Sequence, residues 1–164
     1  MLKIGHDAPQ FCLPNQDDVN MCLKAFKGKW IILYFYPKDN TPGCTNEACD
    51  FTETMPLFDD MDAVILGVSP DSTQSHRNFI EKKNLEITLL SDLEKSVHKA
   101  YAAWGMKKNY GKEYEGVIRT TYIITPDQKI AAAWNNVKVR VKRKDGEVRH
   151  ADVVREKLAE LQQG

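Results

Sequence analysis

The sequence lacks the features that mark nucleic-acid-binding and membrane proteins. Its 23 Lys and Arg residues balance 23 Asp and Glu residues, so there is no basic excess with which to bind an anionic surface. No apolar run is long enough to cross a bilayer, and the N-terminal MLKIGHDAPQF has no basic stretch followed by an apolar segment. We therefore expect a soluble, cytoplasmic protein that binds a small or neutral partner, not nucleic acid or a membrane.

Cysteine is also scarce, and its spacing argues against three common uses. The four cysteines, at positions 12, 22, 44 and 49, are too few and too irregular for a disulfide-stapled secreted scaffold. None belongs to a Cys-x-x-Cys motif, which a thiol/disulfide oxidoreductase of the thioredoxin kind needs. One Cys-x4-Cys motif without a second close Cys/His pair is weak evidence for a zinc site. We expect no metal and no other cofactor, and we predict that the scattered histidines are surface or capping residues: His6, His76, His98 and His150.

The order of the apolar runs predicts an α/β protein. WIILYFY (30–36) and AVILGVS (63–69) are continuous apolar runs, typical of strands buried on both faces. Between them, residues 45–58 carry apolar side chains at every third or fourth position, which predicts a helix. Further helices are predicted at 72–83 and from about His150 to Gln162.

Two hairpins complete the predicted fold. RTTYIITPDQKIAAAW contains two β-rich runs around Pro126, and FCLPNQDDVNMCL turns at residues 15–18. ITLLSD predicts a short strand, and LEKSVHKAYAAWG predicts a helix that turns Leu93 and Tyr101 to one face. These elements predict a three-layer α/β fold, a mixed central sheet flanked by helices with an N-terminal β-hairpin. Because there is no repeat or linker, residues 1–164 are expected to form a single domain.

Cys44 is the first candidate for chemistry. It follows Pro42 and Gly43, so a helix is predicted to begin at Gly43 or Cys44, at the carboxyl end of a buried strand, where ligands of open α/β sheets tend to bind. The unpaired N–H groups of a first helical turn stabilise a thiolate over a thiol. Thr41, three residues earlier, can direct its hydroxyl toward a molecule that contacts the Cys44 sulfur. The alternative is that Cys44 is a small buried hydrophobe, the usual fate of a free cysteine.

These residues resemble a known active site. PKDNTPGC is similar to the peroxiredoxin signature Pro-x-x-x-Thr-x-x-Cys, through Pro37, Thr41 and Cys44. With the second cysteine of CTNEACDF, the sequence resembles the bacterioferritin comigratory protein, or Q-type, subfamily. The likeness continues through APQFCLPNQD, ILYFYPKD, LGVSPDS, TLLSD and IRTTYIITPD in the order of that family. The resemblance implies a thioredoxin-like fold.

The resemblance also implies a thiol-dependent peroxidase that reduces hydrogen peroxide and organic hydroperoxides. Cys44 would attack the peroxide O–O bond and become a sulfenic acid. Thr41 would hydrogen-bond the bound peroxide, and Arg119 would bring its guanidinium to the sulfur and the reacting oxygens. For Arg119 the alternative is an ordinary ion pair with Glu47. Three further residues are assigned to the substrate site and its support: Pro37, Gly43 and Glu47, the last of which steers Arg119.

The spacing of Cys44 and Cys49 raises a separate question. In an intact helix these residues lie about 7.5 Å apart along the axis and are rotated by roughly 140°. A disulfide needs Cα atoms about 4.4–6.8 Å apart with converging side chains. We therefore expect Cys49 to resolve the Cys44 sulfenic acid only after the first helical turns unwind, and by resemblance a thioredoxin-like dithiol to reduce the product. Alternatively, Cys49 is a core residue. The resemblance also implies a monomer.

Two features fall outside this interpretation. Cys12 and Cys22 lie in the two arms of the N-terminal hairpin, where cross-strand contact is possible, and we predict that they are buried or idle thiols. VKVRVKRKDGEVR (137–149) is locally basic and longer than the resemblance accounts for. Its alternation predicts an edge strand with a turn at Asp145 and Gly146. Nucleic-acid or membrane binding is the alternative for this tract.

Overall fold

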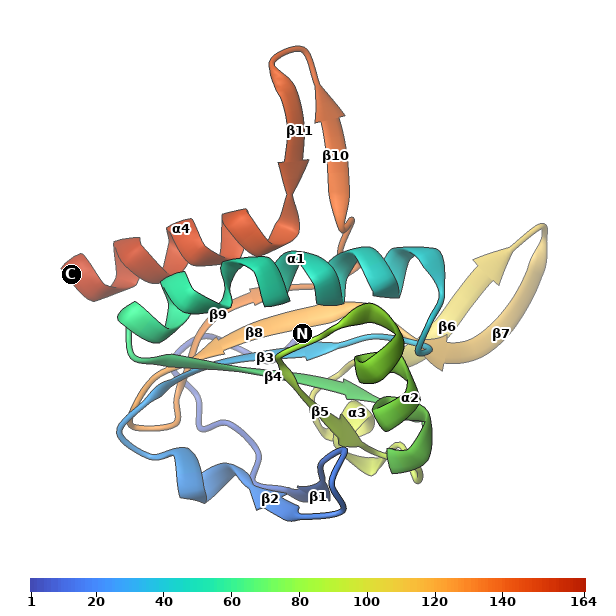
Figure 1. Ribbon diagram of the computed structural model, residues 1–164, viewed down its shortest axis with the longest axis horizontal. Coiled ribbons are helices and arrows are strands. Elements are labelled where there is room, and N and C mark those ends of the chain that lie inside the picture. Colours follow the sequence, from blue (N-terminus) through green and yellow to red (C-terminus); the bar gives the residue numbers. More distant parts are fainter.

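The computed structural model describes all residues, 1–164, and is built around a five-stranded mixed sheet (Figure 1). The strand order is β5-β4-β3-β8-β9. Strands β3, β4 and β5 are parallel, whereas β8 is antiparallel to β3 and to β9. The strands of this sheet are β3 (Trp30–Phe35), β4 (Ala63–Ser69), β5 (Thr88–Ser91), β8 (Thr120–Ile124) and β9 (Ile130–Trp134).

Both faces of the sheet are covered. One face carries α1 (Pro42–Asp60), α2 (Thr73–Lys83) and α4 (His150–Gln163) over one buried apolar cluster. The other face carries α3 (Ser96–Ala100), the short helix η1 (Leu23–Phe26) and the hairpin β1 (Cys12–Pro14) and β2 (Asn20–Cys22) over a second cluster. The predicted three-layer α/β architecture with an N-terminal hairpin is confirmed. No helix combines the length and the hydrophobicity that crossing a membrane requires.

Two segments differ from the sequence prediction. The helix expected in LEKSVHKAYAAWG is shorter, because Lys95 adopts a left-handed conformation (φ 64°) and the chain turns before α3. Leu93 is consequently exposed, so its assignment to an inward helical face was wrong, although Tyr101 is buried. The hairpin β6 (Trp104–Asn109) and β7 (Lys112–Val117) was not predicted. Most of its side chains are exposed, so no alternation of apolar and polar residues marks it.

The basic tract lies outside the main sheet. It forms a separate two-stranded hairpin, β10 (Arg140–Arg143) and β11 (Gly146–Arg149), that projects from the body of the protein (Figure 1). Both strands of a two-stranded hairpin are edge strands, and the chain reverses at the predicted turn, so the predicted edge strand and turn are confirmed, although β10 begins at Arg140 rather than Val137. The hairpin pairs with itself because the tract contains both a turn and a second β-rich run, so it needs no sheet edge.

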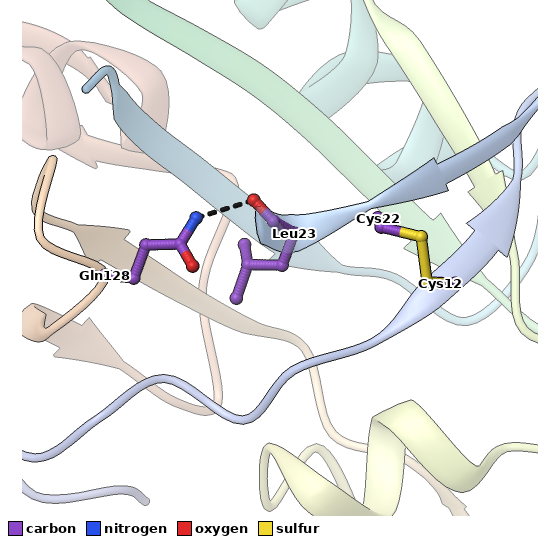
Figure 2. Close-up of a disulfide and its surroundings, with 4 residues drawn as sticks. All are labelled: Cys12, Cys22, Leu23 and Gln128. Carbon is purple, nitrogen blue, oxygen red and sulfur yellow. Dashed lines mark hydrogen bonds between the residues drawn. A yellow bond between two sulfur atoms is a disulfide. The ribbon is translucent and has the colours of Figure 1, made fainter. Parts of the chain in front are cut away.

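The N-terminal hairpin carries a disulfide between Cys12 and Cys22 (Figure 2). The prediction of idle thiols was wrong, because the register of β1 and β2 places these two residues directly opposite each other. Leu23, the next residue, is fully buried, and its carbonyl accepts a hydrogen bond from Gln128 Nε2 at 2.6 Å. The disulfide thus closes a hairpin that is anchored to the sheet. It lies on the opposite face from Cys44.

Replacing both cysteines of this disulfide (Cys12→Ser/Cys22→Ser) should lower the free energy of unfolding by about 2–3 kcal/mol, because the reduced unfolded chain regains the entropy of a short closed loop. Urea unfolding of wild type and the double variant measures this difference in the free energy of unfolding. The comparison is made under oxidising conditions, which keep the wild-type disulfide, and under non-oxidising conditions. Peroxide reduction should stay unchanged, since the disulfide lies across the sheet from Cys44. A folded double variant that has lost peroxide reduction would contradict this separation.

Candidate active site

The start of α1 places Cys44 in the first turn of a long helix, at the carboxyl end of β3. The helix begins at Pro42, one residue earlier than predicted, and Thr41 is the N-cap residue in an extended conformation. Proline suits the first helical position because its fixed φ is compatible with the helix and its missing N–H would be unpaired there in any case. Cys44 itself is buried and is a free thiol.

Three predicted residues meet at this helix start. Arg119 Nη2 donates a hydrogen bond to Cys44 Sγ at 3.2 Å, and Arg119 Nη1 donates one to Glu47 Oε1 at 2.6 Å. The guanidinium therefore bridges the sulfur and a carboxylate one helical turn further along α1. Arg119 lies just before β8 rather than within the strand as expected. Its side chain is 17% exposed, so it is the part of this cluster that faces the solvent.

Burial and charge act against each other in this cluster. Burial raises the pKa of Glu47 to about 7, although the positive charge of Arg119 and its hydrogen bond oppose the shift. Burial alone would lower the pKa of Arg119, but the charges of Glu47 and Cys44 outweigh it and raise that pKa above its ordinary value. Arg119 therefore remains a cation in contact with the sulfur of Cys44.

The loop residues have distinct places around the sulfur. Gly43 leaves room for the guanidinium, because a Cβ atom there would lie 3.3 Å from Arg119 Nη2. The Thr41 hydroxyl donates to the Lys38 carbonyl at 2.9 Å, so its oxygen lone pairs remain free to accept a hydrogen bond. Pro37, two residues after the end of β3, is partly buried.

A buried polar network that the sequence did not predict holds this loop. The Asp39 carboxylate contacts His76 Nδ1 at 2.7 Å and accepts a hydrogen bond from the Tyr36 hydroxyl at 2.5 Å. His76 Nε2 donates to the Leu90 carbonyl at 3.0 Å, and the Asp39 N–H donates to Asp71 Oδ2 at 2.8 Å. These bonds join the loop before Cys44 to α2 and β5.

The histidine predictions were mostly wrong. His6 is exposed, but His76, His98 and His150 are buried. The signal for His76 was its spacing from Phe79, because residues three apart on a helix lie on the same face and Phe79 is buried. No group of His, Cys, Asp or Glu side chains comes together that could hold a metal ion.

His150, at the start of α4, gives the protein a specific pH dependence. Burial, followed by the positive charge of Arg119, lowers its pKa from 6.5 to about 4. The folded state therefore binds fewer protons than the unfolded state between these values, and stability is lost as the pH falls from about 6.5 to about 4. The full loss is about 3 kcal/mol.

His150→Gln keeps a partner for Thr121, which His150 Nε2 contacts at 2.9 Å, but it cannot bind a proton. Urea unfolding between pH 4 and pH 7 gives the free energy of unfolding at each pH. In this variant that free energy should change less steeply with pH than in wild type, by the equivalent of up to one proton. His6→Gln, at an exposed position, is the matched control. Equal slopes for wild type and His150→Gln would show that His150 is not kept neutral by burial.

Cys49 lies further along α1 and is partly buried. Burial, followed by the negative charge of Asp50, raises the pKa of its thiol. Cys44 and Cys49 are both free thiols within one helix. The structure therefore holds the pair in the arrangement that forbids a disulfide while the helix is intact.

A free cysteine at a helix start beside a guanidinium, carried on a mixed sheet, is the arrangement of a thiol peroxidase of the thioredoxin-like class. Residues 4–133 match the AhpC/TSA family. Peroxiredoxin Bcp of Bacillus subtilis is 47% identical over 139 residues, which cover 85% of this chain and 88% of that protein. The chain belongs to the AhpC/TSA family, among the bacterioferritin comigratory protein or Q-type peroxiredoxins, which are thiol-dependent peroxidases.

Solved structures agree with this assignment and with the thioredoxin-like fold. The bacterioferritin comigratory protein of Xanthomonas campestris superposes with a TM-score of 0.83 at 38% identity, covering 92% of this chain and 91% of that chain. A cysteine-to-serine mutant of PrxQ from Xylella fastidiosa has a TM-score of 0.88 at 32% identity, covering 99% of this chain and 98% of that one.

Proposed function

We propose that this chain reduces hydrogen peroxide and organic hydroperoxides with Cys44 as the peroxidatic residue. The observation that carries the proposal is the 3.2 Å contact between Arg119 Nη2 and Cys44 Sγ. The thiolate attacks one peroxide oxygen, the O–O bond breaks, and the other oxygen leaves with a proton as water or an alcohol. Sulfur loses two electrons and becomes a sulfenic acid. The relative from X. campestris was studied for alkyl peroxide reduction, which supports organic substrates.

The residues around the sulfur have separate roles in this step. Arg119 stabilises the thiolate and the negative charge that develops on the leaving oxygen, and Glu47 fixes the orientation of Arg119. Thr41 accepts a hydrogen bond from the peroxide. Gly43 and the loop from Pro37 leave space for the guanidinium and the substrate.

Cys49 completes the cycle in this proposal. After the start of α1 unwinds, the Cys49 sulfur attacks the sulfenic sulfur, a Cys44–Cys49 disulfide forms and water leaves. A thioredoxin-like dithiol then reduces this disulfide. We propose that residues 1–164 act as one catalytic domain, as a monomer, in the cytoplasm.

The test is a coupled assay in which thioredoxin, its reductase and NADPH supply electrons for several hydroperoxides. NADPH oxidation should depend on both the peroxide and the protein. Cys44→Ser should remove the activity completely. If Cys44→Ser consumes peroxide at the wild-type rate, Cys44 is not the peroxidatic residue.

A further inference from the structure

The hairpin β10–β11 contacts α1 at the residue that follows Cys49. Asp50 is buried on α1, with its side chain 2% exposed. Arg140 donates to both of its oxygens, from Nε to Oδ2 at 3.0 Å and from Nη2 to Oδ1 at 2.7 Å. Arg149 Nη1 donates to Asp50 Oδ1 at 3.3 Å and to Glu53 Oε2 at 2.9 Å. Two arginines of the hairpin thus share Asp50, and Arg149 also contacts Glu53.

The register of the hairpin explains why both arginines contact Asp50. Arg140 and Arg149 are directly opposite each other across the two strands. Like charges in that position destabilise a strand pair unless an anion lies between them. The Asp50 carboxylate supplies that anion. The hairpin and α1 therefore stabilise each other through one shared charge.

The base of the hairpin is held by the rest of the fold. The N–H of Val137 donates to the Arg119 carbonyl at 3.0 Å, and the N–H of His150 donates to the Val139 carbonyl at 2.8 Å. Arg140 and Arg149 therefore extend from an anchored hairpin base, which is hydrogen-bonded to the backbone of Arg119.

The helical hydrogen bonds connect this contact to the chemistry. In an α-helix each N–H bonds the carbonyl four residues earlier, so unwinding residues 44–49 releases N–H groups up to residue 53. Asp50 and Glu53 lie within that range, and Glu53 is its last member. The two residues that the arginines hold are therefore among those that lose their helical bonds when Cys49 turns toward Cys44.

We propose that Arg140 and Arg149, bound to Asp50 and Glu53, form a latch that keeps α1 wound around Cys49 and slows formation of the Cys44–Cys49 disulfide. This inference rests on the proposed resolving role of Cys49. While the latch holds, the sulfenic acid persists and can meet a second peroxide. That peroxide gives one oxygen to the sulfur and leaves as water or an alcohol, so Cys44 becomes a sulfinic acid. Arg140 and Arg149 are positioning residues, because they act through α1 and do not contact the substrate.

The double variant Arg140→Gln/Arg149→Gln releases the latch, and Arg143→Gln, an exposed position on the same hairpin, is the matched control. After one equivalent of peroxide, rapid quenching and mass spectrometry should show the disulfide forming about tenfold faster in the double variant, about 1.4 kcal/mol. With excess peroxide, the ratio of sulfinic acid to disulfide should fall about tenfold. The rate of sulfenic acid formation and the helix content of the reduced protein should match wild type. A general loss of structure would change both.

Two further measurements make the test independent of that variant. Asp50→Asn removes the shared charge and should also accelerate disulfide formation. High salt should accelerate it in wild type and have little effect in the double variant, because the arginine side chains are about one third exposed and their ion pairs are screened. Unchanged disulfide rates in both latch variants, with a Cys44–Cys49 disulfide still forming, would overturn the latch alone. No such disulfide in wild type would overturn the resolving role of Cys49, and the latch with it.

Discussion

Replacing Arg119 with alanine should slow the oxidation of Cys44 by peroxide about 100- to 1000-fold, or about 2.7–4 kcal/mol of transition-state stabilisation. Arg119 Nη2 lies 3.2 Å from Cys44 Sγ, and the 2.6 Å contact of Nη1 with Glu47 fixes the plane of the guanidinium. A donor that is already oriented needs no rearrangement when charge moves from sulfur to the leaving oxygen. Stopped-flow measurement of a single turnover on reduced protein gives this rate directly.

The control separates transition-state stabilisation from ionisation of the thiol. The rate at which iodoacetamide alkylates Cys44 reports its thiolate, whereas the rate with peroxide reports both effects. In Arg119→Ala and Thr41→Val, the rate of the peroxide reaction should fall by a larger factor than the rate of alkylation. The peroxide reaction of Arg119→Lys should be faster than that of Arg119→Ala and slower than that of wild type. One ammonium group cannot reproduce the planar guanidinium that contacts the sulfur and the carboxylate together. Equal losses in the two reactions would mean that these residues only ionise the sulfur.

Replacing Cys49 with serine should lower the steady-state rate with a thioredoxin-type dithiol by roughly 100-fold or more, because the sulfenic acid then has no thiol in the chain to resolve it. The first turnover should keep its rate, since Cys49 does not contact the peroxide in this mechanism. In wild type, mass spectrometry should find a crosslink between residues 44 and 49 after oxidation. Circular dichroism should show a loss of helix at the same time.

The outcome for Cys49→Ser distinguishes the resolving residue from a structural one. The variant should form no intramolecular disulfide with Cys44, and its helix content should stay constant on oxidation. Cys12→Ser/Cys22→Ser is the control, because it removes the disulfide on the other face of the sheet without leaving an unpaired thiol. If Cys49→Ser still closes a disulfide on Cys44, another cysteine resolves the sulfenic acid.

Much of the site could be predicted because its parts are local in sequence. Pro42 and Cys44 lie within one turn of a helix that follows a buried strand, and periodicity alone placed that helix. Arg119 was different, since nothing in its neighbourhood indicates that it contacts residue 44. The resemblance to peroxiredoxins predicts its role, and only the structure places it before β8 rather than in the strand.

The errors have a common physical cause. Cys12 and Cys22 form a disulfide and are not idle thiols, because pairing in a hairpin depends on the register of its strands, which the spacing of two cysteines does not give. His76 is buried and not at the surface, because Asp39 and the Leu90 carbonyl satisfy both of its ring nitrogens. Those partners come from different elements.

The sequence by itself determined the alternation of strands and helices, the start of the helix that carries Cys44, and the helical spacing that keeps Cys49 out of reach. Hydrophobic period and the chemistry of helix ends act over a few residues, so they can be read along the chain. Only the packed tertiary structure brings Arg119, which the resemblance had named, to the sulfur, and only the structure shows which two arginines hold Asp50. Those contacts join residues 75 to 99 positions apart, and they exist only once the sheet and its helices have packed.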